Sequence, residues 1–259
     1  MRCAVVGHVE WVEFARVPEL PTAGSIVHAT QVWSEPAGGG AGVARQIARL
    51  VGRCEFFTAL GDDALGHEAA KQLSTLGIDV HALHGGETRR AWTYVDEHGE
   101  RTITVLGDKL LPRGPLPLDG YDAVFFVSGD VAALHSARAA RLLAATLRER
   151  PTLSEGRVPL DLLVGSLNDA GEQYDDSLDA KIVVLTDGGN GGIVNGERFP
   201  AAELPGEISD AYGAGDSFAA ALLVGLARGD DVAAAVQLGA RAGAAVITGQ
   251  GPYTAQLTS

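Results

Sequence analysis

Apolar residues follow two patterns that alternate along the chain. One is a short continuous apolar run, typical of a strand buried on both faces. The other is a stripe at helical spacing, such as Val43, Ile47 and Leu50. Their alternation predicts an α/β fold with a mostly parallel sheet covered by helices on both faces. The expected strands are 2–7, 55–59, 123–127, 160–164 and 182–185, and the expected helices are 43–50, 65–76, about 128–150, 218–228 and 232–247.

Two segments depart from this rhythm and alternate more polar residues with apolar ones. Residues 92–95 and 102–105 flank the turn-forming segment 96–100, which predicts a β-hairpin. Residues 26–33 are also strand-like. We therefore expect a small β appendage beside the main sheet. The chain shows no internal repeat and no low-complexity linker, which favours one domain over 1–259.

Composition narrows the class of protein. The 259 residues are 46% hydrophobic, enough for one large core but short for two full domains. The net charge of −13 and the lack of a Lys/Arg cluster argue against a nucleic-acid partner. Two cysteines suggest neither a disulfide framework nor a cysteine zinc site, and the seven histidines show no metal-ligand spacing. With no signal-peptide layout and no bilayer-length apolar stretch, we expect a soluble, cytoplasmic protein without membrane partners.

The most informative segment is 210–216, where Gly213, Ala214 and Gly215 precede Asp216 and a run of helix formers. The first turn of a helix has backbone N–H groups without partners and partial positive charge. Glycine lets a phosphate approach that backbone closely, so the segment predicts an anion site. A carboxylate at its mouth suits a site that takes a proton from an alcohol. The plainer alternative is a loop followed by a helix cap.

This segment resembles the G-A-G-D signature of the ribokinase-like (PfkB) family of carbohydrate and nucleoside kinases, with Ala211 where that family usually has threonine. Further segments resemble family elements in the same order, and together they span almost the whole chain. These are 5–7, 21–24, 37–44, 58–66, 88–102 and 184–189. The resemblance implies a three-layer α/β sandwich with a small β lid, formed by segments near 9–33 and 88–105.

The resemblance also implies roles for the site residues. Asp216 is expected to be the catalytic base, and Gly213, Ala214 and Gly215 are expected to stabilise the transferred phosphoryl group. Gly38 and Gly39 are candidates to contact the sugar. Val12 stands where the family has its substrate aspartate, and Glu10, which shares a strand face with it, is the expected substitute. Thr186 and Gly188 are candidate contacts to nucleotide phosphates.

The implied metal sites are less regular. The magnesium-related N-x-x-E element falls on 166–169, with a shifted alternative through Asn168 and Glu172. Asp169 or Glu172 is therefore the candidate to hold metal-bound water, and a surface position is the alternative for each. Asp210, together with 249–252, resembles the loops that hold a monovalent cation in some members of the family. The expected cofactors are ATP and Mg²⁺, with the monovalent cation as a further candidate.

The leading hypothesis is an ATP-dependent kinase for a sugar or sugar-like alcohol, including nucleoside-like acceptors, that forms a homodimer through its lid. The alternative is a degenerate member that binds nucleotide or sugar without efficient turnover, because Val12, Gly42 and Ser166 depart from the family pattern. A dinucleotide oxidoreductase is disfavoured, since no G-x-G-x-x-G follows the first strand. The absence of a G-x-x-x-x-G-K-[ST] segment likewise disfavours a P-loop kinase.

Overall fold

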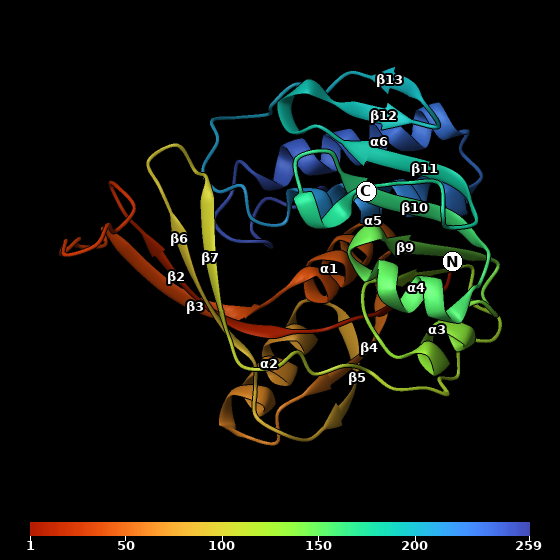
Figure 1. Ribbon diagram of the computed structural model, residues 1–259, viewed down its shortest axis with the longest axis horizontal. Helices are drawn as coiled ribbons and strands as arrows, with labels where there is room; N and C mark the ends of the chain where they lie inside the picture. The colour runs from red at the N-terminus through yellow and green to blue at the C-terminus, as the bar shows by residue number, and fades with distance from the viewer.

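The computed structural model describes residues 1–259 and is organised around a central sheet of nine strands (Figure 1). Their order across the sheet is β13-β12-β11-β10-β9-β8-β1-β4-β5. Neighbouring strands from β11 to β5 are all parallel. Strand β12 pairs antiparallel with both β11 and β13. The strands are β1 (Cys3–Val6), β4 (Cys54–Leu60), β5 (Ile78–His84), β8 (Ala123–Phe126), β9 (Leu142–Thr146), β10 (Leu160–Ser166), β11 (Ala180–Thr186), β12 (Gly192–Val194) and β13 (Glu197–Phe199).

Helices cover both faces of this sheet, as the alternating pattern predicted. One face packs against α1 (Gly39–Val51), α2 (Ala64–Thr75), α5 (Ala214–Arg228) and α6 (Val232–Val246), and the other against α3 (Val131–Ala137) and α4 (Arg150–Gly156). Successive residues of β1 enter opposite cores, because side chains alternate along a strand. The three-layer α/β sandwich with its mostly parallel sheet is thus confirmed. No helix combines the length and apolar character needed to cross a membrane.

The single long helix expected over about 128–150 is wrong. That stretch holds α3, then strand β9, then a short 3-10 turn (Leu147–Glu149), and α4 begins at Arg150. The sequence Leu-Leu-Ala-Ala-Thr has good helix formers, but it is an apolar run that pairs between β8 and β10. Burial in the sheet overrides the local preference. Pro151, in the first turn of α4, suits a new helix start.

A second sheet of four strands, here called the lid sheet, stands beside the central one (Figure 1). Its order is β3-β2-β6-β7, formed by β3 (Gln31–Ala37), β2 (Glu10–Arg16), β6 (Arg90–Val95) and β7 (Arg101–Leu106). The predicted hairpin is therefore present as β6 and β7, which pair antiparallel. The strand expected over 26–33 begins later, at Gln31, and Ile26 is 87% exposed. The small β lid is confirmed as part of the fold.

The lid sheet has its own apolar core where it meets the body. Phe14 of β2 stacks on Trp33 of β3 with ring centroids 4.8 Å apart, and it meets Tyr212 edge to face at 5.1 Å. Tyr212 directly precedes Gly213, the N-cap residue of α5. The inner face of the lid sheet is thereby anchored on the loop that leads to Asp216.

Candidate active site

The backbone at the start of α5 is arranged to receive an anion. Gly213 is the N-cap residue with φ of 82°, a left-handed conformation that glycine adopts without strain. No side chain caps this helix, so N–H groups of its first turn are available to a ligand. Asp210 shapes the preceding loop, because its buried carboxylate accepts the N–H groups of Tyr212 and Gly251, each at 2.9 Å.

Asp216 lies in this first turn and faces the glycine-rich start of α1. A β-carbon at Gly39 would lie 3.2 Å from Oδ1 of Asp216, and one at Gly42 would lie 3.3 Å from Oδ2. The lack of side chains at these glycines lets the backbone of α1 approach the carboxylate closely. Burial raises the pKa of Asp216, and the positive charges of Arg101 and Arg148 act in the opposite direction. A more basic carboxylate is a better proton acceptor.

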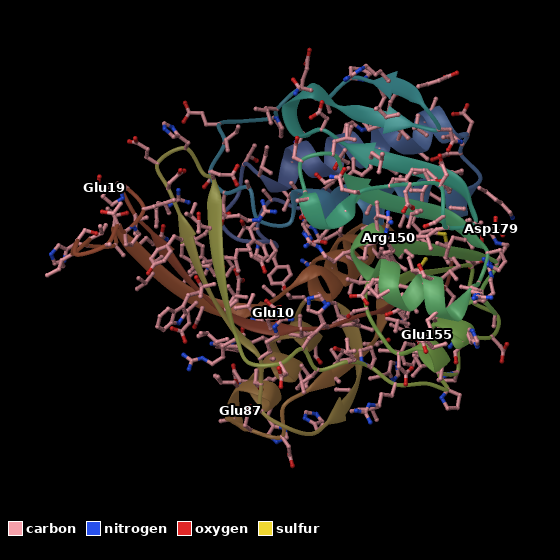
Figure 2. The ribbon with its side chains drawn as sticks, viewed as in Figure 1. Glu10, Glu19, Glu87, Arg150, Glu155 and Asp179 are labelled. Atoms are coloured by element: carbon pink, nitrogen blue, oxygen red, sulfur yellow. The ribbon has the colours of Figure 1, made fainter.

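Glu10 lies at the junction of the lid and the body, where Figure 2 labels it. It is only 7% exposed, and its Oε1 lies 3.1 Å from Nη1 of Arg89. Burial raises the pKa of Glu10, while Arg89 and Lys109 oppose the shift. A β-carbon at Gly38 would lie 3.5 Å from the backbone nitrogen of Glu10. The structure therefore brings Glu10, Gly38, Gly39 and Asp216 into one region.

His8 contributes to the same region and was not among the sequence candidates. Its Nδ1 lies 3.0 Å from Oγ of Ser128, and its Nε2 lies 3.7 Å from Oε1 of Glu10. Burial, with the nearby charges of Lys109 and Arg89, lowers the pKa of His8 to about 3. The imidazole is therefore neutral at pH 7, and Arg89 is the charge partner of Glu10.

Thr186 and Gly188 lie where β11 leaves the sheet. The hydroxyl of Thr186 donates to the carbonyl of Gly165 in β10 at 3.2 Å, and a β-carbon at Gly188 would lie 3.9 Å from Nδ2 of Asn168. The turns after β10 and β11 thus lie together at the carboxyl ends of parallel strands. Ligands bind at this end of open α/β sheets.

Arg148 follows β9 and joins the two candidate metal carboxylates. Its guanidinium forms ion pairs with Asp169 and with Glu172, where Nε lies 3.2 Å from Oε1. Burial raises the pKa of Glu172, and the charge of Arg148 opposes that shift. Two converging carboxylates are the oxygen ligands that Mg²⁺ prefers, so the donor set fits this ion. In this structure the positive charge of Arg148 offsets the negative charges of Asp169 and Glu172.

Sequence patterns did not identify Arg148, Arg89 or His8 as site residues. Arg148 fell inside the helix expected over about 128–150, although the apolar run before it and Pro151 after it were signals for a strand end. Arg89 and His8 meet Glu10 only through the pairing of β2 with β6 and the exit from β1. No local spacing carries that information.

Comparison with known proteins places this geometry in a family. The family model described as pfkB family carbohydrate kinase matches residues 1–150 and 151–258. The ATP-dependent ribose-1-phosphate kinase of Halopiger xanaduensis is 27% identical, over 98% of this chain and 95% of the relative. The 5-dehydro-2-deoxygluconokinase of Geobacillus thermodenitrificans is 26% identical, over 82% of this chain and 78% of the relative.

Solved structures agree on the fold. The ribokinase of Thermotoga maritima has a TM-score of 0.80 and 21% identity, and the match covers 100% of this chain and 96% of that one. The ribokinase of Giardia lamblia has a TM-score of 0.81 and 19% identity, with 97% and 94% covered. The chain therefore belongs to the pfkB family and is a carbohydrate kinase, an enzyme that transfers a phosphoryl group to an alcohol group.

Proposed function

We propose that this kinase phosphorylates a sugar or sugar-like alcohol with ATP and uses Asp216 as its general base. The hydroxyl proton of the acceptor passes to Asp216 while the alcohol oxygen bonds to the γ-phosphorus, and the bond to the β-phosphate breaks to release ADP. The N–H groups of Gly213, Ala214 and Gly215 stabilise the negative charge on the transferred group. The observation that carries the proposal is the position of the Asp216 carboxylate, whose pKa is raised by burial. It lies between the uncapped start of α5 and the glycine backbone at the start of α1.

The acceptor lies against Glu10, Gly38 and Gly39 in this proposal. A buried carboxylate paired with Arg89 is a rigid acceptor for sugar hydroxyls, because the ion pair fixes its orientation. The backbone around the two glycines offers further hydrogen bonds without side chains in the way. We treat the chain as one domain, 1–259, in which lid segments near 9–33 and 88–105 cover the substrate. A nucleoside, whose ribose carries the same hydroxyls, is an acceptor of the same class.

ATP binds at the other end of the site, with its phosphates toward Thr186, Gly188 and the start of α5. A solved ribokinase of Cryptococcus neoformans was obtained in complex with ADP, and it shares this fold with a TM-score of 0.74. Mg²⁺ would be held by Asp169 and Glu172, directly or through water, and would offset the negative charge of the phosphates. Arg148, which both carboxylates hold near Asp216, adds positive charge on the same side. Asp210 and the 249–252 loop would hold a monovalent cation in this proposal.

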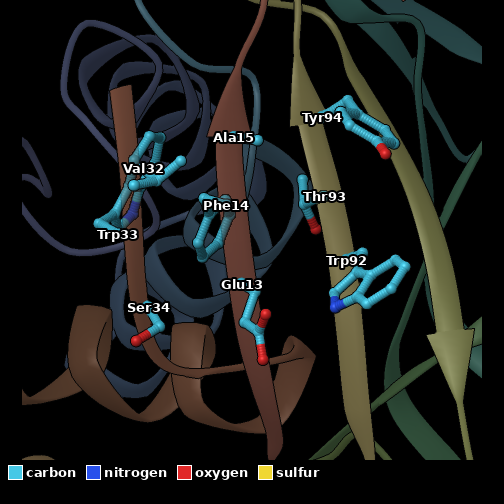
Figure 3. Close-up of a pocket in the computed structure, with 9 residues that line it drawn as sticks. All are labelled: Glu13, Phe14, Ala15, Val32, Trp33, Ser34, Trp92, Thr93 and Tyr94. Atoms are coloured by element: carbon cyan, nitrogen blue, oxygen red, sulfur yellow. The ribbon is translucent and has the colours of Figure 1, made fainter. Parts of the chain in front are cut away.

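The outer face of the lid sheet is the proposed homodimer interface. Ala15 pairs with Val32 on one side and with Tyr94 on the other, so these residues share the face opposite Phe14. Val32 is 72% exposed, and Trp92 on the same face is 46% exposed. A hollow of about 520 Å³ lies across these strands, and Figure 3 shows the residues that line it. The same face of a second copy is the occupant that we propose. We expect this enzyme in the cytoplasm.

A panel of sugars and nucleosides, assayed for ADP release with ATP and Mg²⁺, tests the proposal. Saturable ADP release with one acceptor class, lowered by at least about 10²-fold in Asp216→Asn, supports it. The alternative is a degenerate member that binds nucleotide or sugar without efficient turnover. It is favoured by three positions that depart from the family pattern, Val12, Gly42 and Ser166. Tight ATP binding with no acceptor that releases ADP would favour that alternative. Release that Asp216→Asn leaves unchanged would remove Asp216 from its role.

A further inference from the structure

Three side chains that can bind metal gather at the surface, among residues that the kinase site does not use. They are Asp62 in the loop after β4, His67 in the first turns of α2, and His84 at the end of β5. Each offers one ligand atom, and these atoms lie within 4.8 Å of one another. The rings of His67 and His84 are stacked with centroids 4.8 Å apart. Because the three residues come from different elements, their spacing in the sequence does not predict that they lie together.

The spacing of His67 and Asp62 fits a shared ion better than a direct hydrogen bond. Nε2 of His67 lies 3.5 Å from Oδ1 of Asp62, beyond the range of about 2.7–3.2 Å for a good N–H···O bond. Two ligands at about 2.1 Å from a tetrahedral zinc ion are roughly 3.4 Å apart. The pair is thus spaced as two ligands of one ion.

His84 has the outer contact that metal-binding histidines usually show. Its Nδ1 lies 3.1 Å from the carbonyl oxygen of Gly61, which can accept the Nδ1 proton. That hydrogen bond fixes the tautomer and leaves Nε2 free to bind a metal. Gly61 directly precedes Asp62, so the same turn orients two of the three ligands.

The surrounding backbone holds the three side chains in place. Asp63 caps α2 by accepting the N–H of Gly66 at 2.8 Å, and it accepts the N–H of Thr88 at 2.7 Å. The N–H of Asp62 donates to the carbonyl of Gly86 at 3.1 Å. The loop after β4 and the connection after β5 are therefore already joined. A metal bound here orders little additional backbone.

We propose that Asp62, His67 and His84 bind a divalent transition-metal ion, with Zn²⁺ as the best fit and water at the fourth position. Two imidazoles and one carboxylate suit zinc, whereas Mg²⁺ and Ca²⁺ prefer oxygen ligands alone. The side chains of His67 and Asp62 are 61% and 70% exposed, so water reaches the ion. The ion links the loop after β4, α2 and the end of β5, from which the chain runs through Thr88 and Arg89 into β6 of the lid sheet.

Titration of the chelator-treated full-length protein with Zn²⁺ alone, followed by calorimetry, tests this site. We expect one equivalent to bind, a rise in Tm, and no competition from millimolar Mg²⁺. His67→Gln and His84→Gln should each weaken binding by at least about 10-fold, as should Asp62→Asn. These exposed positions allow the variants to fold, which their Tm without metal will show. Cys3 and Cys54 are buried and do not compete as ligands.

His98→Gln is the matched control, because His98 is exposed and lies 3.8 Å from the carboxylate of Glu97 but has no second histidine. It should bind Zn²⁺ as the wild type does. Co²⁺ in place of Zn²⁺ should give the visible absorption of a four-coordinate ion, and His84→Gln should abolish it. The absence of saturable binding would overturn the proposal. Binding that survives in both His67→Gln and His84→Gln would overturn it equally.

Discussion

At the scale of single residues, Asp216 carries the most direct prediction. Asp216→Asn keeps the size of the side chain and removes the proton acceptor. The fold should survive, because asparagine is well tolerated near a helix N-terminus. ATP binding should be unchanged or tighter, since a negative charge near the phosphates is lost. We expect kcat to fall by about 10²–10⁴-fold, the usual effect of losing a general base, measured as ADP release on an acceptor that the wild type uses.

Asp210→Asn is the control for that experiment, since it makes the same exchange in the loop that precedes α5, whereas Asp216 lies in the first turn of the helix. Asp210 accepts two backbone N–H groups, and an asparagine carboxamide has only one oxygen to accept them. One buried N–H loses its partner, at a cost of about 1–3 kcal/mol. The Tm of Asp210→Asn should therefore fall, whereas Asp216→Asn should lower turnover with little change in Tm. If the two variants behaved alike, Asp216 would have only a structural role.

The pH profile offers a second observation on the same carboxylate. Asp216 must be ionised to accept a proton, and burial raises its pKa. The activity of the wild type should therefore fall on the acidic side at a higher pH than an ordinary aspartate would give.

The close approach of α1 to Asp216 can be tested with one added methyl group. In Gly39→Ala the new β-carbon would lie 3.1 Å from Cγ1 of Val127 and 3.2 Å from Oδ1 of Asp216. Either the carboxylate or the backbone must shift by a few tenths of an ångström. We expect kcat/KM to fall by about 10-fold to 10²-fold, because small misplacements of reacting groups are costly. Gly85→Ala is the control, since its β-carbon would have no neighbour within 4 Å. Equal activity in the two variants would contradict the close packing of α1 against Asp216.

At the scale of elements, Glu35 of β3 connects the lid sheet to the loop after α6. Its Oε1 accepts the indole N–H of Trp33 at 3.2 Å, and its carboxylate lies against Gly251. Burial, together with the charge of Asp210, raises the pKa of Glu35 to about 7. The unfolded chain has an ordinary pKa near 4.5, so the folded state binds more protons between these values. Stability should therefore fall as pH rises from about 5 to 8.

Glu35→Gln should remove much of this slope. The shift corresponds to up to about 3 kcal/mol at alkaline pH, so the variant should melt at a higher temperature than the wild type at pH 8 and differ little at pH 5. Thermal melts at the two pH values provide the measurement. Glu13→Gln, which removes an exposed partner of Arg90 in the adjacent strand, is the control and should keep the slope. An unchanged slope in Glu35→Gln would mean that Glu35 is not the group that titrates.

The elements also show which parts of the molecule are predictable from sequence. The helix start at Gly213–Asp216 has a local signal, because glycines, a carboxylate and helix formers are adjacent in the chain. Strand β9 has no such signal, since Leu142–Thr146 becomes a strand only by pairing with β8 and β10. The same limit applies to Arg148, which meets Asp169 and Glu172 only because the ends of β9 and β10 lie side by side. The proximity of Glu10 to Gly38 likewise depends on the pairing of β2 with β3.

At the scale of the whole molecule, ATP with Mg²⁺ should stabilise the protein. A ligand that binds only the folded state at about 100 times its Kd adds roughly 2.7 kcal/mol. For a chain of this size that is a rise in Tm of roughly 5–10 °C. Differential scanning fluorimetry with millimolar ATP–Mg²⁺ gives the shift, and NAD at the same concentration should give none. Equal melting temperatures with and without ATP–Mg²⁺ would contradict a nucleotide site at Thr186 and Gly188.

The assembly of two copies depends on the outer face of the lid sheet. Val32 and Trp92 expose apolar surface there, and on the proposed dimer this surface is covered by its counterpart. Light scattering after size exclusion should give a mass near twice the 26.8 kDa of one chain. The double variant Val32→Lys, Trp92→Lys should place like charges across the interface and give the mass of one chain. Leu204→Lys, a similar change at a residue that is 47% exposed outside the lid, should leave the mass unchanged. A wild type that stays at 26.8 kDa at high concentration, or a double variant that stays at twice that mass, would show that this face does not join the copies.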